Sequence, residues 1–185
     1  MAAIDRERFQ VVPLGVTKDG AWLTPEETQA ALAAIKAERL ASLTAPPAAG
    51  GIRPQVLAAL GELDVVFPLV HGTFGEDGTL QGMLEMLDVA YVGAGVAASA
   101  VGMDKALQQM ILRQAGLPVP QSLVVTASRW HEEGPALARE VEGRLGYPCF
   151  VKPANSGSSI GTSKARSRED LADAMAEAFR YDRRR

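Results

Sequence analysis

The chain has 185 residues, of which 47% are hydrophobic and 22% are charged, and its formal net charge is -3 at pH 7. This composition is typical of a folded protein with a core, in one domain or two small ones, and it excludes a disordered tail. The slightly negative net charge does not indicate a surface that binds nucleic acid. We interpret the basic run at 181–185 as a solvated helix end.

The cysteine content and the N-terminus bear on the compartment. Cys149 is the single cysteine, which excludes an internal disulfide framework, and beside Phe150 and Val151 it is expected to be a small buried strand residue. Residues 1–10 carry acids and bases where a secretory signal would be apolar, and no apolar run approaches the roughly 18 residues that a membrane span needs. We therefore expect a cytoplasmic protein.

The N-terminal part of the chain begins with a strand pattern followed by a helix pattern. Residues 9–17 alternate as a strand, and the pair Asp19-Gly20 marks a turn. Residues 25–43 predict a helix, with Pro25 and acidic residues in its first turn.

A continuous apolar run at 64–70 is typical of a strand covered on both faces of a parallel sheet. It leads into a loop at 71–78 and then into a helix that starts near Thr79. This order puts the loop at the carboxyl end of a strand, where open α/β sheets bind ligands. Three apolar residues at helical spacing are expected in the core: Met83, Met86 and Leu87.

The rest of the chain continues the alternation. The expected elements are a short strand at 90–93, a small-residue segment at 95–102, a helix at 104–116, a strand at 121–126, a helix near 135–144, a strand at 147–152 and a last helix at 167–182. Ser167 and Asp170 are expected to form a capping box for the last helix. The pattern argues for an α/β fold with a change of domain near 103–120.

The stretch VKPANSGSSIG at 151–161 places Lys152 at a strand end, directly before a loop of glycine and serine. Backbone N–H groups and one mobile cation suit a phosphate, although such loops also simply connect strands. It is not a Walker-type loop, because the lysine of that motif follows its glycines whereas Lys152 precedes them. The segments at 15–20 and 93–99 also lack the nucleotide-binding spacing.

Three ordered blocks resemble a known family: HGTFGEDGTLQG at 71–82, VGMDK at 101–105 and GYPCFVKPANSGSSIG at 146–161. They closely resemble the D-alanine–D-alanine ligases of bacterial cell-wall synthesis, members of the ATP-grasp superfamily, and residues 11–23 resemble that family's N-terminal domain. The resemblance implies an α/β fold. Residues 1–102 would form an N-terminal parallel-sheet domain of the pre-ATP-grasp, Rossmann-like kind, and residues 103–185 the first part of an ATP-grasp α+β domain.

The resemblance also implies the chemistry. ATP phosphorylates the carboxylate of one D-alanine, and the amine of a second D-alanine attacks the acylphosphate. For the complete family it implies Mg²⁺ or Mn²⁺, peptidoglycan synthesis and a homodimer. The sequence lacks counterparts of the family's first strand, adenine hinge, catalytic arginine and metal ligands. We therefore expect a chain truncated at both ends, inactive in isolation and without metal ligands.

Individual site residues follow from the same resemblance. The residues expected to bind ATP are Lys105, Lys152, Gly157, Ser159 and Gly161. Lysines can stabilise a transferring phosphoryl group, and glycines allow close backbone approach. His71 and Ser158 are expected at the catalytic centre, with His71 orienting the first D-alanine and its acylphosphate and stabilising charge rather than transferring a proton.

Some alternatives stay open. A lone histidine is structural by default, and the pair Glu76-Asp77 invites a metal or acid–base interpretation, but we favour carboxylates that brace the loop and cap the next helix. His131 is expected at the surface. The sequence does not separate D-alanine from D-lactate as second substrate, and another carboxylate–amine ligase or a non-catalytic remnant are the alternatives.

Overall fold

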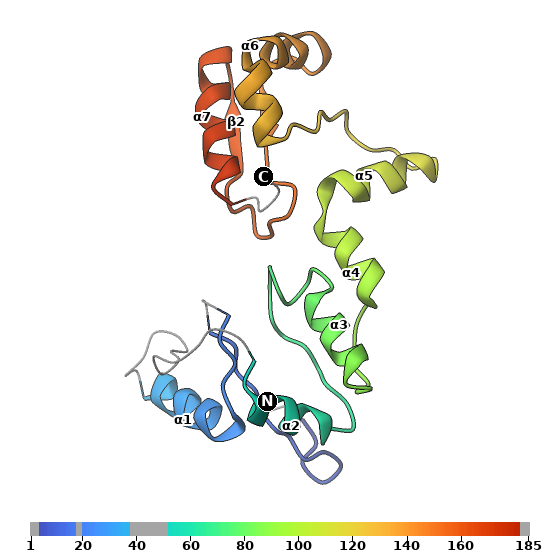
Figure 1. Ribbon diagram of the computed structural model, residues 1–185, viewed down its shortest axis with the longest axis vertical. Coiled ribbons are helices and arrows are strands. Elements are labelled where there is room, and N and C mark those ends of the chain that lie inside the picture. Colours follow the sequence, from blue (N-terminus) through green and yellow to red (C-terminus); the bar gives the residue numbers. More distant parts are fainter. Residues whose placement is uncertain (1–3, 18–19, 38–51, 182–185) are drawn as a thin grey trace. The chain divides into compact units, whose positions relative to one another are not determined.

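The computed structural model describes residues 4–17, 20–37 and 52–181. Within these ranges the protein is α/β, with seven helices and two strands (Figure 1). In chain order the elements are α1 (Pro25–Lys36), α2 (Pro54–Gly61), α3 (Thr79–Met86), α4 (Val96–Met103), α5 (Lys105–Gln114), α6 (Ala127–Arg144), β1 (Cys149–Val151), β2 (Ser163–Ala165) and α7 (Arg168–Phe179).

The chain divides into two compact units. The N-terminal unit comprises the residues up to 68 together with 83–93, and the C-terminal unit comprises 69–82 together with the residues from 94 onward. The expected domain boundary between residues 102 and 103 stays a prediction. No helix of the described ranges is long and apolar enough to cross a bilayer.

In the N-terminal unit, the start of α1 is fixed by a capping box. The Thr24 hydroxyl accepts a hydrogen bond from the Glu27 N–H, and the Glu27 carboxylate accepts one from the Thr24 N–H. Arg53, the residue before α2, pairs with the same carboxylate and donates to the Trp22 carbonyl at 3.0 Å. One arginine thus ties the starts of two helices together. The predicted helix is confirmed through Lys36, and its expected continuation at 38–43 lies outside the described residues.

The strands predicted at 9–17 and 64–70 are much less regular than expected. Only isolated bridges form there, antiparallel between Val16 and Trp22 and parallel between Val66 and Tyr91. The prediction that the run at 64–70 is covered on both faces is wrong, since Val65, Phe67 and Leu69 expose 49%, 66% and 74% of their surface. A strand is stabilised by its cross-strand partners, and apolar composition alone does not supply them.

The core of the N-terminal unit contains four fully buried side chains: Leu23, Val56, Leu60 and Leu84. The prediction that Met86 belongs to the core is wrong, because 90% of its surface is exposed, while Met83 and Leu87 are half-buried. Residues two apart on a helix point in nearly opposite directions, so burial of Leu84 turns Met86 toward solvent.

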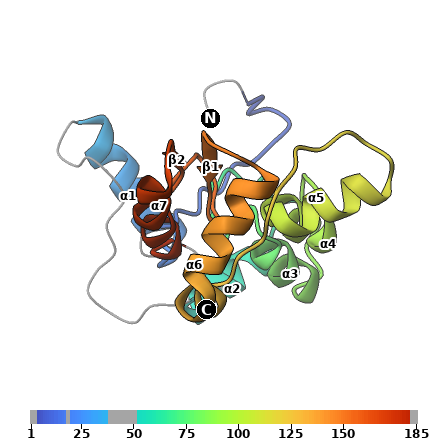
Figure 2. The same cartoon turned by 90° about the horizontal axis from the view of Figure 1, so that it is seen from above.

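The C-terminal unit has an antiparallel hairpin in which Phe150 of β1 pairs with Lys164 of β2. Helices α6 and α7 lie beside this hairpin in both views (Figure 1, Figure 2). Six buried residues form its core: Ala138, Val141, Ala165, Leu171, Ala174 and Met175. The expected strand at 121–126 is extended chain without a ladder, although its residues Leu123 and Val125 pack against this core.

Two further predictions for this unit need correction, and two of its elements were not predicted. Helix α6 begins at Ala127, capped by Thr126, well before the predicted start near 135, so that Pro135 lies inside it. The small-residue segment forms α4, and β2 was not predicted. The capping box of α7 is half formed: Ser167 accepts from the Asp170 N–H, but the Asp170 carboxylate accepts from the Arg166 N–H instead.

The Arg53 pair predicts how acid destabilises the fold. The Arg53 hydrogen bond and the Thr24 N–H lower the pKa of Glu27 from 4.5 to about 2. A carboxyl with a depressed pKa stabilises the fold above its unfolded pKa, and this contribution is lost as pH falls toward the folded value. We expect Glu27→Gln to lower the urea midpoint at pH 7 and to have little effect at pH 2.

The matched control is Glu26→Gln, which removes a charge from the same helical turn but leaves the pair with Arg53 intact. Equal midpoint changes for Glu27→Gln at the two pH values, or equal changes for both variants at pH 7, would contradict the role of the pair.

Candidate functional site

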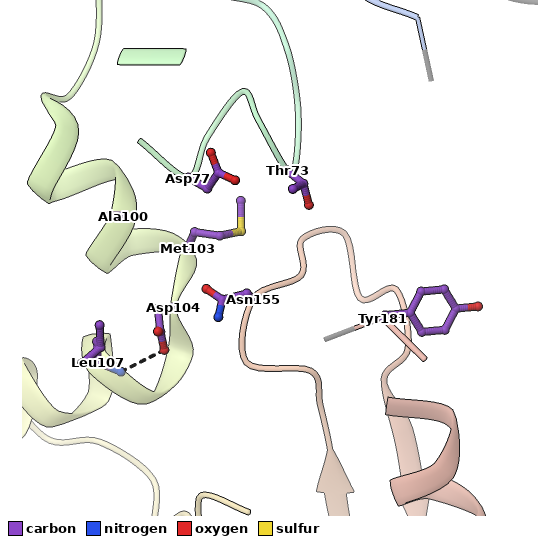
Figure 3. A pocket seen from close by; sticks show the side chains of 8 residues that line it. All are labelled: Thr73, Asp77, Ala100, Met103, Asp104, Leu107, Asn155 and Tyr181. Carbon is purple, nitrogen blue, oxygen red and sulfur yellow. Dashed lines mark hydrogen bonds between the residues drawn. The ribbon is translucent and has the colours of Figure 1, made fainter. Parts of the chain in front are cut away.

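The three blocks of sequence converge on one pocket in the C-terminal unit, with a volume of about 320 Å³. Its lining residues are Thr73, Asp77, Ala100, Met103, Asp104, Leu107, Asn155 and Tyr181. Figure 3 shows the loop with Thr73 and Asp77 on one side, α4 and α5 on a second, and the segment with Asn155 on a third. Segments far apart in the sequence therefore surround a single space.

Glycines let the loop at 71–78 pack tightly. A Cβ on Gly75 would lie 2.2 Å from the Val70 carbonyl oxygen, and one on Gly78 would lie 2.8 Å from that of Val96. Gly78 also has a φ of 89°, which side chains rarely adopt. The loop therefore lies directly on the chain that precedes it and on the first turn of α4.

The two carboxylates of this loop bind its own backbone. Asp77 accepts from the Phe74 N–H at 3.0 Å and the Thr79 N–H at 3.1 Å, and Glu76 accepts from the Gly72 N–H. Burial would raise the pKa of the Asp77 carboxyl, but hydrogen bonds from the Thr79 side chain and from the Phe74 and Thr79 N–H groups hold the pKa below its usual value. The interpretation that both carboxylates brace the loop is confirmed, but only Asp77 also reaches the start of α3.

His71 stands at the entry of the same loop. Its side chain is 87% exposed, and its Nδ1 atom lies 4.0 Å from the Glu76 Oε1 atom. It does not line the pocket, although Thr73, two residues on, does. The imidazole is thus accessible to a ligand, with a carboxylate beside it.

Lys105 connects α5 to the glycine-serine loop. It follows Asp104, a buried N-cap whose carboxylate accepts from the Ala106 and Leu107 N–H groups at 3.0 and 3.1 Å (Figure 3). The Lys105 N–H donates to the Ala154 carbonyl at 3.0 Å, and its ammonium donates to the Ser156 carbonyl. One residue thus holds the loop at two carbonyls.

The loop at 151–161 has an unusual backbone. Ser158, Ser159 and Gly161 have φ angles of 51°, 58° and 70°, in the left-handed region. Such conformations cost a serine about 1 kcal/mol or more, so they persist only where the surroundings impose them. Both serines are exposed, and a Cβ on Gly157 would lie 3.9 Å from the Gly72 Cα atom, which places the two loops next to each other.

Lys152 lies on the exposed face of the hairpin. Its ammonium is 6.0 Å from the centroid of the Phe150 ring, and that of Lys164 is 5.9 Å from the same centroid. The ring itself is 63% exposed. An exposed aromatic surface between two cations can stack a planar base and attract phosphate.

The structure therefore brings His71, Lys105 and Gly157 to the surroundings of the pocket, while Lys152 lies on the hairpin face. Sequence reasoning missed three residues that line the pocket, Asp104, Asn155 and Tyr181, and also Lys164 on the hairpin face. Asp104 could have been identified as an N-cap directly before a helix pattern, and Asn155 lies inside the block at 146–161. Lys164 and Tyr181 carry no local signal, because their positions depend on β2 and on the end of α7.

Within the described ranges, no group of three or more histidine, cysteine, aspartate or glutamate side chains has the arrangement of a metal site. The acidic residues of the pocket instead bind backbone N–H groups, as described above for Asp77 and Asp104.

Comparisons with known proteins agree with one another. The family model described as D-ala D-ala ligase N-terminus matches residues 1–94, and that described as D-ala D-ala ligase C-terminus matches residues 111–184. The D-alanine–D-alanine ligase of Geobacillus thermodenitrificans is 44% identical over 193 residues, covering 100% of this chain and 52% of that protein. That of Kineococcus radiotolerans is 44% identical over 204 residues, covering 98% and 52%.

Two solved structures are similar along nearly the whole chain. The D-alanine-D-alanine ligase from Coxiella burnetii has a TM-score of 0.71 and 30% identity, covering 98% of this chain and 54% of that one. The VanG D-Ala:D-Ser ligase from Enterococcus faecalis has a TM-score of 0.72 and 29% identity, covering 98% and 53%. The chain spans about half the length of the curated relatives it matches.

The tight loop at 71–78 generates a prediction about two glycines. Gly75→Ala should lower the free energy of unfolding by about 1–3 kcal/mol, because the new methyl group meets a backbone carbonyl that cannot turn aside. Gly82→Ala is the matched control: nothing lies within 4 Å of its Cβ position, and alanine favours a helix by up to about 1 kcal/mol. Urea denaturation of both variants measures the difference, and equal stabilities would refute the tight packing.

Proposed function

The chain belongs to the D-alanine–D-alanine ligase family, and from this we propose that it serves the ATP-dependent joining of two D-alanines. The γ-phosphoryl group passes to the carboxylate of the first D-alanine and leaves ADP. The amine of the second D-alanine then attacks the carbonyl carbon of the acylphosphate, loses a proton and expels inorganic phosphate. The observation that carries the proposal is the convergence of the three blocks on one pocket.

The donor groups of the C-terminal unit support ATP as the phosphoryl donor. ATP presents a planar base and a chain of anionic oxygens. The Phe150 ring between Lys152 and Lys164 offers a stacking surface and two cations, and the loop at 157–161 offers N–H groups and serine hydroxyls. We assign Lys152, Gly157, Ser159 and Gly161 to this nucleotide side.

Lys105 and Ser158 are assigned to the phosphate that is transferred. The Lys105 ammonium is already directed to the loop through the Ser156 carbonyl, so a short movement would bring it to an anion beside the loop. A fixed cation contributes most where negative charge develops, which for this reaction is the transferring phosphoryl group.

His71 is assigned to the D-alanine side. It lies next to Glu76 at the entry of the loop whose other residues line the pocket. An imidazole at this position can orient a substrate carboxylate and donate a hydrogen bond to the acylphosphate. It need not transfer a proton in this role.

Divalent metal ions fit less well than ATP. Mg²⁺ takes carboxylate and water oxygens, and the described residues offer no cluster of acids for it. We therefore assign no step to a metal among the residues described. Action in the cytoplasm, a role in peptidoglycan synthesis and assembly as a homodimer stay predictions.

The identity of the second substrate is the part of the proposal that an assay must decide. One structural neighbour is a D-Ala:D-Ser ligase, so related proteins differ in what they join to D-alanine. Assay of the protein expressed from its complete gene with ATP and D-alanine alone, or with D-serine or D-lactate added, identifies the product. D-alanyl-D-alanine as main product supports the proposal. A mixed product would indicate another carboxylate–amine ligase, and no product would indicate a non-catalytic remnant.

The nucleotide assignment predicts the effect of removing one cation. Lys152→Ala should weaken ATP binding about 10- to 100-fold, because a hydrogen bond to a charged group contributes about 1.5–3 kcal/mol. Lys36→Ala is the control, since it removes an exposed lysine at the end of α1 in the N-terminal unit. Calorimetric titration with ATP measures both, and equal affinities in the two variants would remove Lys152 from the site.

The histidine assignment predicts a different kinetic pattern. In the protein expressed from its complete gene, His71→Ala should lower kcat by about 10²–10³, as loss of one donor to a developing anion does. It should also raise KM for the first D-alanine and change KM for ATP little. His131→Ala, at an exposed position of α6, is the matched control and should change neither. A rise in KM for ATP alone would mean that the 71–78 loop has been assigned to the wrong substrate.

A further inference from the structure

One aromatic side chain outside the three blocks contacts the loop at 151–161. A Cβ on Gly161 would lie 2.6 Å from Cδ2 and 3.2 Å from Cγ of the Tyr181 ring, and 2.8 Å from Cγ of Pro153. Gly161 is therefore enclosed between two rings, with no room for a side chain. Its φ of 70° also requires a residue tolerant of the left-handed region.

The Tyr181 ring packs where the two ends of the loop meet. Pro153 is buried at the start of the loop and Gly161 stands at its end, so the Tyr181 ring packs where the two limbs come together. Inside the loop, the Ser156 hydroxyl donates to the Ile160 carbonyl at 3.2 Å. The base of the loop is thus closed by packing and its middle by a hydrogen bond.

Tyr181 is itself held in place by the fold. It follows α7 directly, and its N–H donates to the Ala178 carbonyl at 3.1 Å. Helix α7 in turn packs on the hairpin through Leu171, Ala174 and Met175. Tyr181 also lines the pocket, and Figure 3 shows it and Asn155 on the two sides of the loop.

We propose that Tyr181 is a positioning residue for the phosphate-binding loop, acting through Gly161 and Pro153. Its ring sets the end of the loop, while Lys105 holds the Ala154 and Ser156 carbonyls nearer the start. Between these two supports lie Ser158 and Ser159, with φ angles in the left-handed region, and the supports keep this backbone ready for a ligand. The inference rests on the proposed function for the identity of that ligand, a nucleotide phosphate.

Hydrogen exchange of the ligand-free protein tests the support itself. The Ile160 and Thr162 N–H groups donate within the loop, to Gly157 and Ser159 carbonyls at 3.1 Å. Tyr181→Ala should speed their exchange at least fivefold without changing exchange in α1. Tyr181→Phe keeps the ring and should match the natural protein. Unchanged exchange in Tyr181→Ala, or equal acceleration in Tyr181→Phe, would overturn the proposal.

A double-mutant cycle tests whether the contact acts through Gly161. Gly161→Ala places a methyl group against the ring, and this clash should weaken ATP binding more than tenfold. Adding Tyr181→Ala removes the ring and should recover part of the loss, so the two changes are not additive. Additive losses would overturn the proposal. If the natural protein does not bind ATP, the proposed function fails while the exchange experiment still decides the role of Tyr181.

Discussion

The site depends on how Lys105 holds the glycine-serine loop. Its N–H and its ammonium bind the Ala154 and Ser156 carbonyls, and the Asp104 cap fixes the helix end from which both donors project. Without such support, Ser158 and Ser159 would leave the left-handed region, because that conformation costs about 1 kcal/mol or more for each. A loop that is held in place in this way can present N–H groups to an anion without first ordering itself, so the entropy of ordering is lost during folding rather than during binding.

The loop at 71–78 completes the site, and it is held by close packing at its glycines rather than by ion pairs. The loop at 71–78 lies against Val70 and α4 because Gly75 and Gly78 have no side chain there, and its carboxylates bind its own N–H groups. Both acids of this loop, Glu76 and Asp77, are therefore already hydrogen-bonded within it. The acids thus serve the structure, while the lysines and the loop supply positive charge, and such an arrangement suits phosphoryl transfer.

Much of this could be predicted from sequence, and the failures have a common cause. The capped start of α1 and the bracing by Glu76 and Asp77 depend on neighbours within a few residues, so local patterns revealed them. The extent of the strands at 9–17 and 64–70 depends on partners elsewhere in the chain, and the sequence pattern predicts longer strands there than the structure contains. The positions of Lys164 and Tyr181 could not be predicted from local patterns, because β2 and the end of α7 bring them beside Phe150 and Gly161.

We infer that three separate segments form one site for ATP and D-alanine. The most direct test is hydrogen exchange of the protein with and without the two ligands, followed by mass spectrometry of peptides from 71–82, 101–107 and 151–162. We expect slower exchange in all three segments when ATP and D-alanine are both present, and no change in α1. Protection confined to one segment, or protection in none while the ligands bind elsewhere, would contradict it.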